Sequence, residues 1–87
     1  MNKTELIKAV AEESNISNRE ATTVVNAVLN QIMTAVKNGE EVALPGFGTF
    51  GTKNVPARTG EFRGVKYETK EHKAPTFRPG AVFKKDL

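Results

Sequence analysis

The chain has 87 residues, of which 38% are hydrophobic, and a formal net charge of +3 at pH 7. Because it has no cysteine and a single histidine, disulfides, thiolate chemistry and histidine-cluster metal sites are excluded, and we expect neither a metal nor a cofactor. A domain of this size buries only about 60–65% of its unfolded surface, so a lone monomer would be marginally stable and a partner subunit is expected. No apolar run approaches the ~18 residues of a membrane span, and the N-terminus is unlike a signal peptide, so we expect a soluble, cytoplasmic protein.

The charge is unevenly distributed along the chain. Residues 1–50 hold four basic and six acidic residues, a net charge of −2, whereas residues 51–87 hold nine basic and four acidic residues, a net charge of +5. This division favours a scaffold whose second half presents a surface to a polyanion. An ordinary solvated, lysine-rich face is the alternative that composition leaves open.

Two helices are predicted in the first half of the chain. Asn2 can cap a helix over residues 3–14, with Glu5 at the capping-box position three residues further on. Ser17 and Glu20 repeat this spacing at the start of a longer helix, which Gly39 ends. The longer helix carries a wide apolar stripe, which favours packing against a second copy over binding of heme or lipid. The stripe consists of Ala21, Val24, Val25, Val28, Leu29, Ile32, Met33 and Val36.

A sharp corner is predicted between a short strand at residues 42–44 and a longer one at residues 49–57. Pro45 has no amide hydrogen to donate, and we expect Gly46 and Gly48 to adopt backbone angles closed to other residues. Phe47 and Phe50, beside this corner, are expected to be core aromatics.

A basic hairpin that projects from the body is predicted over residues 58–73, which contain few side chains able to fill a core. Gly60 and Gly64 are interpreted as turn positions. The apolar residues close to them are Phe62, Val65 and Tyr67. Residues 74–77 then return to the sheet, and Pro79-Gly80 opens a short basic helix.

Four stretches stand out by their order and spacing along the chain: Met1-Asn2-Lys3-Thr4-Glu5-Leu6, Gly46-Phe47-Gly48-Thr49-Phe50, Ala57-Arg58 with Gly60, and Pro75-Thr76-Phe77-Arg78-Pro79-Gly80. With these motifs in this order, the chain closely resembles the HU/IHF family of bacterial histone-like DNA-binding proteins over essentially its whole length.

The resemblance implies an α+β fold. The expected molecule is an intertwined dimer with a helical base, a three-stranded antiparallel sheet and a protruding β-ribbon arm in each subunit. A single domain would span residues 1–87, with the helical dimerisation base at 1–39, sheet strands at 40–57 and 74–78, the arm at 58–73 and a C-terminal helix at 79–87. Most such dimers are homodimers, and a heterodimer with a paralogue is the alternative. The residues expected in the dimer core are Phe47, Phe50, Phe77, Val28, Leu29 and Ile32.

The function implied is that of an architectural protein, which binds double-stranded DNA with little sequence preference and bends, wraps or compacts it through minor-groove arms. Neutralising phosphates releases counterions, and cations are drawn to a narrow minor groove. The residues that match family DNA contacts are Lys53, Arg58, Arg78 and Lys84, with Lys3 facing flanking phosphates and Lys85 beside Lys84. The expected location is the nucleoid or, for a phage-encoded protein, the host cytoplasm.

The tip of the predicted arm departs from the family. Family arms usually carry Arg-Asn-Pro-x-Thr-Gly, whose proline wedges between base pairs, whereas Gly60-Glu61-Phe62-Arg63-Gly64 has no proline and the arm is about two residues shorter. Phe62 is a substitute wedge, with Arg63 beside it as a groove cation. Packing of Phe62 along the arm is the alternative, and the Glu61 carboxylate argues against the wedge.

Val55 and Ala81 occupy positions where many members have a basic residue. Fewer cations predict weaker binding and a shallower salt dependence, because each phosphate contact contributes about −0.9 to the slope. Lys66, Lys70 and Lys73 on the descending strand of the arm are expected to compensate.

Two other functions compete with this one. The altered arms of an HU-like protein could bind a protein or RNA instead. An enzyme is not expected, because His72 lies among charged arm residues and adjacent pairs such as Glu12-Glu13 diverge on a helix. Gly46-x-Gly48 also precedes a strand, where phosphate-cradling glycine motifs require a helix.

Overall fold

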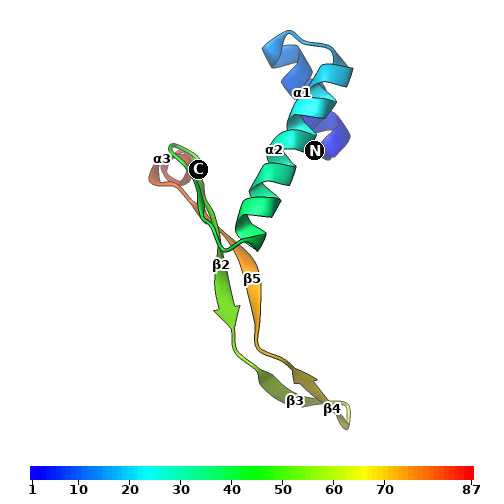
Figure 1. The fold of residues 1–87 in the computed structure, drawn as a ribbon, viewed down its shortest axis with the longest axis vertical. Helices are drawn as coiled ribbons and strands as arrows, with labels where there is room; N and C mark the ends of the chain where they lie inside the picture. Colours follow the sequence, from blue (N-terminus) through cyan, green and yellow to red (C-terminus); the bar gives the residue numbers. More distant parts are fainter. The chain divides into compact units, whose positions relative to one another are not determined.

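The structure, a computed structural model, describes all residues 1–87 as three helices and five strands (Figure 1). The elements are α1 (Lys3–Ser14), α2 (Asn18–Lys37), β1 (Val42–Leu44), β2 (Gly48–Val55), β3 (Arg58–Phe62), β4 (Val65–Thr69), β5 (His72–Pro79) and α3 (Ala81–Lys85). The chain divides into two compact units, Met1–Thr34 and Ala35–Leu87.

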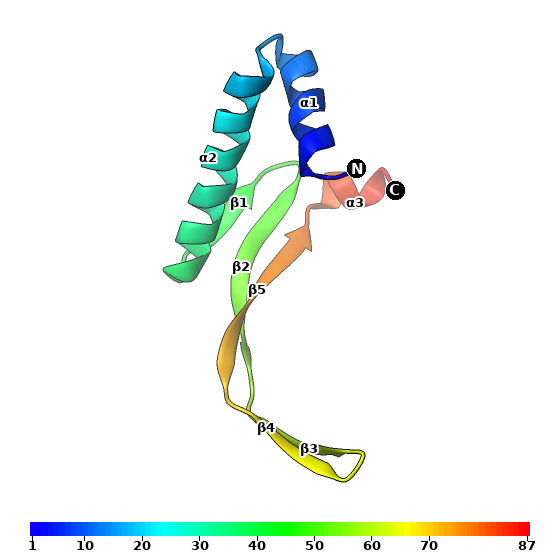
Figure 2. The ribbon, with the colours of Figure 1, turned by 90° about the vertical axis from the view of Figure 1, so that its right-hand side faces the viewer.

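The first unit is a helical hairpin whose ends are capped as the sequence predicts. The Glu5 amide donates to Asn2 Oδ1 at 2.9 Å, and α1 ends at Asn15 in the left-handed region with φ of 56°. The Ser17 hydroxyl and the Glu20 carboxylate form a reciprocal capping box, with N···O distances of 3.0 and 3.2 Å. Both predicted helix starts are confirmed, and Figure 2 shows the two helices joined by a short connection.

Side-chain burial in this first unit is small. Only Ala11 and Ala21 are buried, and both lie near the connection between α1 and α2. The larger apolar residues of α2 remain accessible, with Val28 exposed by 52% and Leu29 by 39%. Much of the apolar stripe therefore remains accessible in the single chain.

The second unit contains the predicted three-stranded antiparallel sheet, in the order β1-β2-β5. α2 ends at Lys37, and Gly39, the predicted stop, follows it with φ of 82°. The Glu40 amide donates to the Ala35 carbonyl in the helix-closing pattern typical of a glycine beyond the helix end. β1 and β2 are joined by a turn in which the Phe47 amide donates to the Leu44 carbonyl at 3.0 Å.

Of the two glycines at this turn, only Gly46 has the backbone angle that the sequence predicted, with φ of 84°. Gly48 has no positive φ, so that expectation was wrong for it. It is required for space instead, because a Cβ there would lie 2.6 Å from the Phe77 ring and 2.7 Å from the Arg78 carbonyl oxygen.

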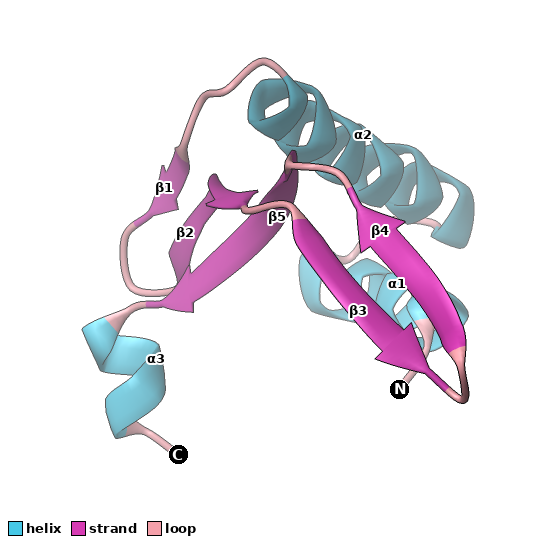
Figure 3. Cartoon of the chain, turned by 90° about the horizontal axis from the view of Figure 1, so that it is seen from below, coloured by secondary structure: helices cyan, strands magenta, loops and turns pink.

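The β2–β5 ladder ends at the pair Val55 and His72, and a separate two-stranded sheet of β3 and β4 follows it (Figure 3). Pro56 lies in the interruption between β2 and β3, and it has no amide hydrogen with which to extend the ladder. The β3–β4 hairpin turns at Arg63 and Gly64, whose φ angles of 52° and 80° are those of a type I′ turn.

Of the hairpin predicted over residues 58–73, the structure forms the part from Arg58 to Thr69, as strands β3 and β4. One of its two expected turn residues is not in a turn. Gly64 is at the turn, whereas Gly60 lies within β3, paired with Tyr67 of β4. The assignment of Gly60 to a turn was therefore wrong, and its reason is steric, as described below.

Candidate functional site

The β2–β5 ladder has two unlike sides, because successive side chains of a strand point to opposite faces. Phe50 and Phe77 are register partners and their ring centroids lie 4.8 Å apart, so they share one face. Lys53, three residues after Phe50, and Arg78, next to Phe77, both fall on the other face by alternation. The sheet therefore separates an aromatic side from a side that carries two of the predicted DNA contacts.

The aromatic side is a cluster of four phenylalanines. Phe47 lies 5.2 Å from Phe77 and 5.6 Å from Phe83, between ring centroids, and the Gly80 amide donates to the Phe47 carbonyl at 2.8 Å. Phe83 was not expected in this cluster. The sequence did contain a signal for it, because Phe83 lies three residues after Gly80, on the first turn of α3, close to the strand that carries Phe77. Phe47, Phe77 and Phe83 are still 44%, 39% and 37% exposed, so the single chain does not cover them.

Arg78 has an acidic partner that the sequence did not indicate. Its Nη2 donates to Glu41 Oε1 at 3.2 Å, the one ion pair in the structure. The Glu41 side chain passes over Gly51, where a Cβ would be 3.5 Å from Glu41 Cγ. A carboxylate thus shares the basic side of the sheet with Lys53 and Arg78.

At the tip of the hairpin, Phe62 and Arg63 lie together. The Phe62 side chain is 66% exposed, and the Arg63 guanidinium carbon is 5.3 Å from the centroid of its ring, a cation–π distance. Val65 is the register partner of Phe62 and is 67% exposed. Packing along the arm therefore leaves most of the Phe62 ring accessible.

A second aromatic side chain lies nearer the middle of the hairpin. Tyr67 is the register partner of Gly60, and a Cβ on Gly60 would lie 2.4 Å from Tyr67 Cζ and Oη. The ring therefore lies across the face of β3 in the space that glycine leaves open. Tyr67 is 50% exposed.

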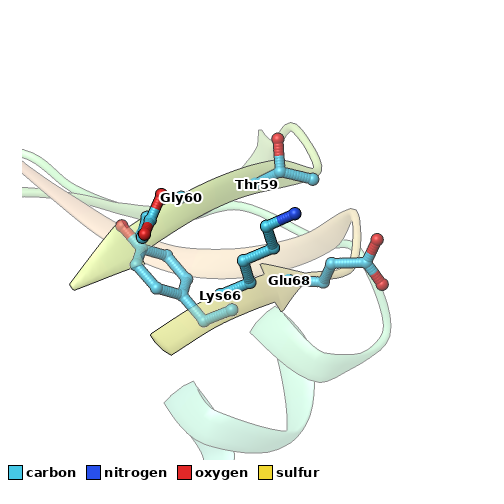
Figure 4. Close-up of a pocket in the computed structure, with 6 residues that line it drawn as sticks. Thr59, Gly60, Lys66 and Glu68 are labelled. Atoms are coloured by element: carbon cyan, nitrogen blue, oxygen red, sulfur yellow. The ribbon is translucent and has the colours of Figure 1, made fainter. Parts of the chain in front are cut away.

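The opposite face of the hairpin is polar, and Figure 4 shows Thr59, Lys66 and Glu68 on it, with the Lys66 side chain extended between the other two. Lys66 is the register partner of Glu61. This face borders a concavity of about 660 Å³, whose lining also includes Gly60 and Tyr67 of the other face; the lining residues are Thr59, Gly60, Glu61, Lys66, Tyr67 and Glu68. Two carboxylates and one ammonium make this face acidic, which does not favour a phosphate contact by Lys66.

The remaining predicted cations are exposed and spread over several elements. Lys53 and Lys73 lie on β2 and β5, Arg58 begins β3, and Lys70 lies between β4 and β5. Lys84 and Lys85 end α3, and Lys3 begins α1 in the other unit. His72 Nδ1 lies 2.9 Å from the Lys70 carbonyl oxygen, so it is the protonated ring nitrogen and donates there.

No group of three or more histidine, cysteine, aspartate or glutamate side chains is placed to hold a metal ion. None of the helices is both long enough and apolar enough to span a bilayer.

Comparison with known proteins identifies what this arrangement is similar to. The family model described as bacterial DNA-binding protein matches residues 1–87. DNA-binding protein HU 1 of Bacillus subtilis (strain 168) is 44% identical over 86 residues, covering 97% of this chain and 94% of that protein. DNA-binding protein HU 2 of Bacillus phage SPbeta is 42% identical over 86 residues, with the same two coverages, 97% and 94%.

A solved structure provides the same comparison in three dimensions. An Anabaena HU–DNA cocrystal structure superposes with a TM-score of 0.93 at 36% sequence identity, covering 99% of this chain and 96% of that one.

Proposed function

Because the chain belongs to the bacterial DNA-binding protein family, with the α+β fold of HU, we propose that it is an architectural protein that binds double-stranded DNA. It bends, wraps or compacts DNA with little sequence preference and acts at the nucleoid, or in a host cytoplasm if a phage encodes it. The observation that carries the proposal is the β-ribbon itself. A ladder from β2 and β5 is followed by a hairpin whose aromatic tip, Phe62, is 66% exposed.

The DNA-binding unit is proposed to be a dimer of two identical chains. The α2 stripe and the phenylalanine cluster leave large apolar side chains accessible, including Val28, Leu29 and Phe77. A chain of 87 residues with only two buried apolar residues cannot be stable alone, because burial of apolar surface is the main favourable term in folding. A second copy that covers Phe47, Phe50, Phe77, Val28, Leu29 and Ile32 supplies the missing burial.

Phosphate neutralisation provides most of the affinity in this proposal. The contributing cations are Lys53, Arg58, Arg63, Lys70, Lys73, Arg78, Lys84 and Lys85, with Lys3 facing flanking phosphates. Lys66 contributes least, since Glu61 and Glu68 lie on its face of the hairpin. Sequence preference is weak because the minor groove chiefly distinguishes A·T from G·C pairs.

Phe62 takes the place of the family's wedging proline at the tip. An aromatic ring inserted between base steps unstacks them and kinks the duplex. The exposure of the ring and the position of Arg63 over it support this role, because the cation accompanies the ring into the region of negative potential.

The proposal is tested by a salt titration of binding to a short duplex labelled at both ends, so that FRET between the ends reports bending. The wild-type protein is compared with Phe62→Ala and with Val82→Ala, a control at a similarly exposed position in α3. Binding with a FRET rise that Phe62→Ala alone loses supports a bending protein with an aromatic wedge. Binding without a FRET change means a protein that coats DNA without kinking it.

A second function is favoured by one observation, the pair of carboxylates on the hairpin face that carries Thr59. Glu61 and Glu68 would repel phosphates and suit a basic partner. An HU-like protein whose arms bind a basic surface of another protein is therefore the alternative, whereas RNA, the other partner considered for altered arms, is disfavoured because it carries phosphates as DNA does. Failure to bind duplex DNA at physiological salt would favour it.

A further inference from the structure

Tyr67 is the single tyrosine of a chain that has no tryptophan. Its ring lies over Gly60, and the position of a Cβ on that residue would be only 2.4 Å from the Tyr67 Cζ and Oη atoms. Any other residue at position 60 would push the ring away from the strand. The hairpin therefore combines a glycine and a tyrosine as cross-strand partners, so that the ring lies flat.

The two faces of the hairpin differ in chemistry. Alternation places Phe62, Val65 and Tyr67 on one face, together with Arg58, and these three apolar side chains are 66%, 67% and 50% exposed. The other face carries Thr59, Glu61, Lys66 and Glu68. One side of the hairpin is thus apolar with a cation, and the other is polar with a net negative charge.

We propose that Tyr67 is a DNA-contacting residue and that the arm enters the minor groove with the Tyr67 face toward the DNA. The inference rests on the proposed function and adds a residue and an orientation to it. The groove is only about 6 Å wide in B-form DNA, so a thick ribbon cannot enter without forcing it open. A ring that lies flat over a residue without a Cβ keeps the hairpin thin at this position.

The chemistry of the tyrosine side chain fits the groove. Its apolar ring packs against deoxyribose carbons, and its hydroxyl donates to the acceptors that the groove presents, adenine N3 and thymine O2. The carboxylates of Glu61 and Glu68 then point away from the groove floor. Lys66, on their side, is expected to contribute little to DNA binding.

The intrinsic fluorescence of Tyr67 can be used to detect its contact with DNA. Excitation at a wavelength that tyrosine absorbs and phenylalanine does not reports the fluorescence of Tyr67 alone, since no other tyrosine or tryptophan is present. The experiment follows this emission during titration with unlabelled duplex, while the anisotropy of a labelled duplex measures affinity independently. The variants are Tyr67→Leu, Gly60→Ala and the double variant, with Thr59→Ala as the uncharged control on the opposite face.

The expected result has three parts. DNA quenches the Tyr67 emission of the wild type and of Thr59→Ala, whose affinity stays within about twofold of wild type, as for a side chain with little net contribution. Tyr67→Leu binds about five- to tenfold more weakly, the lower part of the range for loss of an aromatic contact with DNA. Gly60→Ala weakens binding similarly, and the double variant loses no more than either single variant because both disturb the same contact.

Two results would overturn the inference in distinguishable ways. If the wild type binds the labelled duplex but Tyr67 emission does not change and Tyr67→Leu binds normally, the Tyr67 contact is wrong while DNA binding stands. If the wild type does not bind duplex at low salt, the proposed function fails and the inference fails with it. A loss of affinity in Thr59→Ala equal to that of Tyr67→Leu would reject the orientation of the arm.

Discussion

Arg78 Nη2 donates a hydrogen bond to Glu41 Oε1 at 3.2 Å, so the cation on β5 that was predicted to bind DNA is held by a carboxylate just before β1. Both side chains are about two-thirds exposed, at 69% and 66%. An exposed pair of this kind contributes at most about 1 kcal/mol. A DNA phosphate can therefore displace Glu41 from Arg78 at modest cost.

This competition predicts that Glu41→Gln binds DNA more tightly, by up to about fivefold at low salt, the equivalent of the ion pair that is lost. The salt dependence should steepen by up to about 0.9 in the slope of log K against log salt, since Arg78 becomes free to neutralise a phosphate. Fluorescence anisotropy at several salt concentrations measures both quantities. Glu12→Gln, which removes an exposed charge from α1, is the matched control. An equal gain in both variants would point to net charge alone.

The phenylalanine cluster predicts that replacing phenylalanine by alanine has different effects on stability at two positions, one inside the cluster and one outside it. Phe77→Ala should lower the free energy of unfolding by about 3–5 kcal/mol, because Phe77 contacts Phe47 and Phe50 in the core proposed for the dimer. Phe62→Ala, at the exposed tip, should change it by no more than about 0.5 kcal/mol. Urea denaturation followed by circular dichroism measures both. Similar losses in the two variants would contradict the assignment of Phe77 to the core.

The apolar stripe of α2 predicts that folding depends on association. The melting temperature should rise with protein concentration, because the dimer, and not the isolated chain, is the folded species. Val28→Asp should dissociate and unfold the protein, since it places an unpaired charge in the interface. Analytical ultracentrifugation and thermal melts at several concentrations measure these effects.

Asn30→Asp is the control for this substitution, because position 30 is two residues away on the helix and outside the stripe. It should remain dimeric. A melting temperature that is independent of concentration, with Val28→Asp still folded, would refute the proposed interface.

The capping box at the start of α2 predicts a local effect on stability. Ser17→Ala removes the acceptor of the Glu20 amide hydrogen bond and should cost about 1 kcal/mol of the free energy of unfolding. Ser14→Ala, at the end of α1, removes no hydrogen bond of its side chain in this structure and should cost less. Urea denaturation of both variants tests this, and equal losses would mean that the cap does not act as described.

Local signals in the sequence were sufficient to predict where the two long helices begin and end and where the chain turns between β1 and β2. The caps at Asn2 and Ser17, the stop at Gly39 and the turn at Gly46 each depend on residues within a few positions of one another, and the structure confirms all four. Such signals act through hydrogen bonds and backbone angles that the chain forms with its near neighbours. The order of the elements, together with the motifs, was also enough to indicate the family.

The pairings between strands were decided only by the tertiary structure. The sequence predicted a turn at Gly60, but the strand register pairs this residue with Tyr67. The sequence also gave no sign that Arg78 pairs with Glu41, which is distant in the chain and lies beside it in the fold. Phe83 joins the phenylalanine cluster only because α3 follows the strand beside Phe47. The register of a strand and its long-range contacts depend on which residues the whole fold brings together. The residues near a given position in the sequence do not specify which distant residue will be its partner.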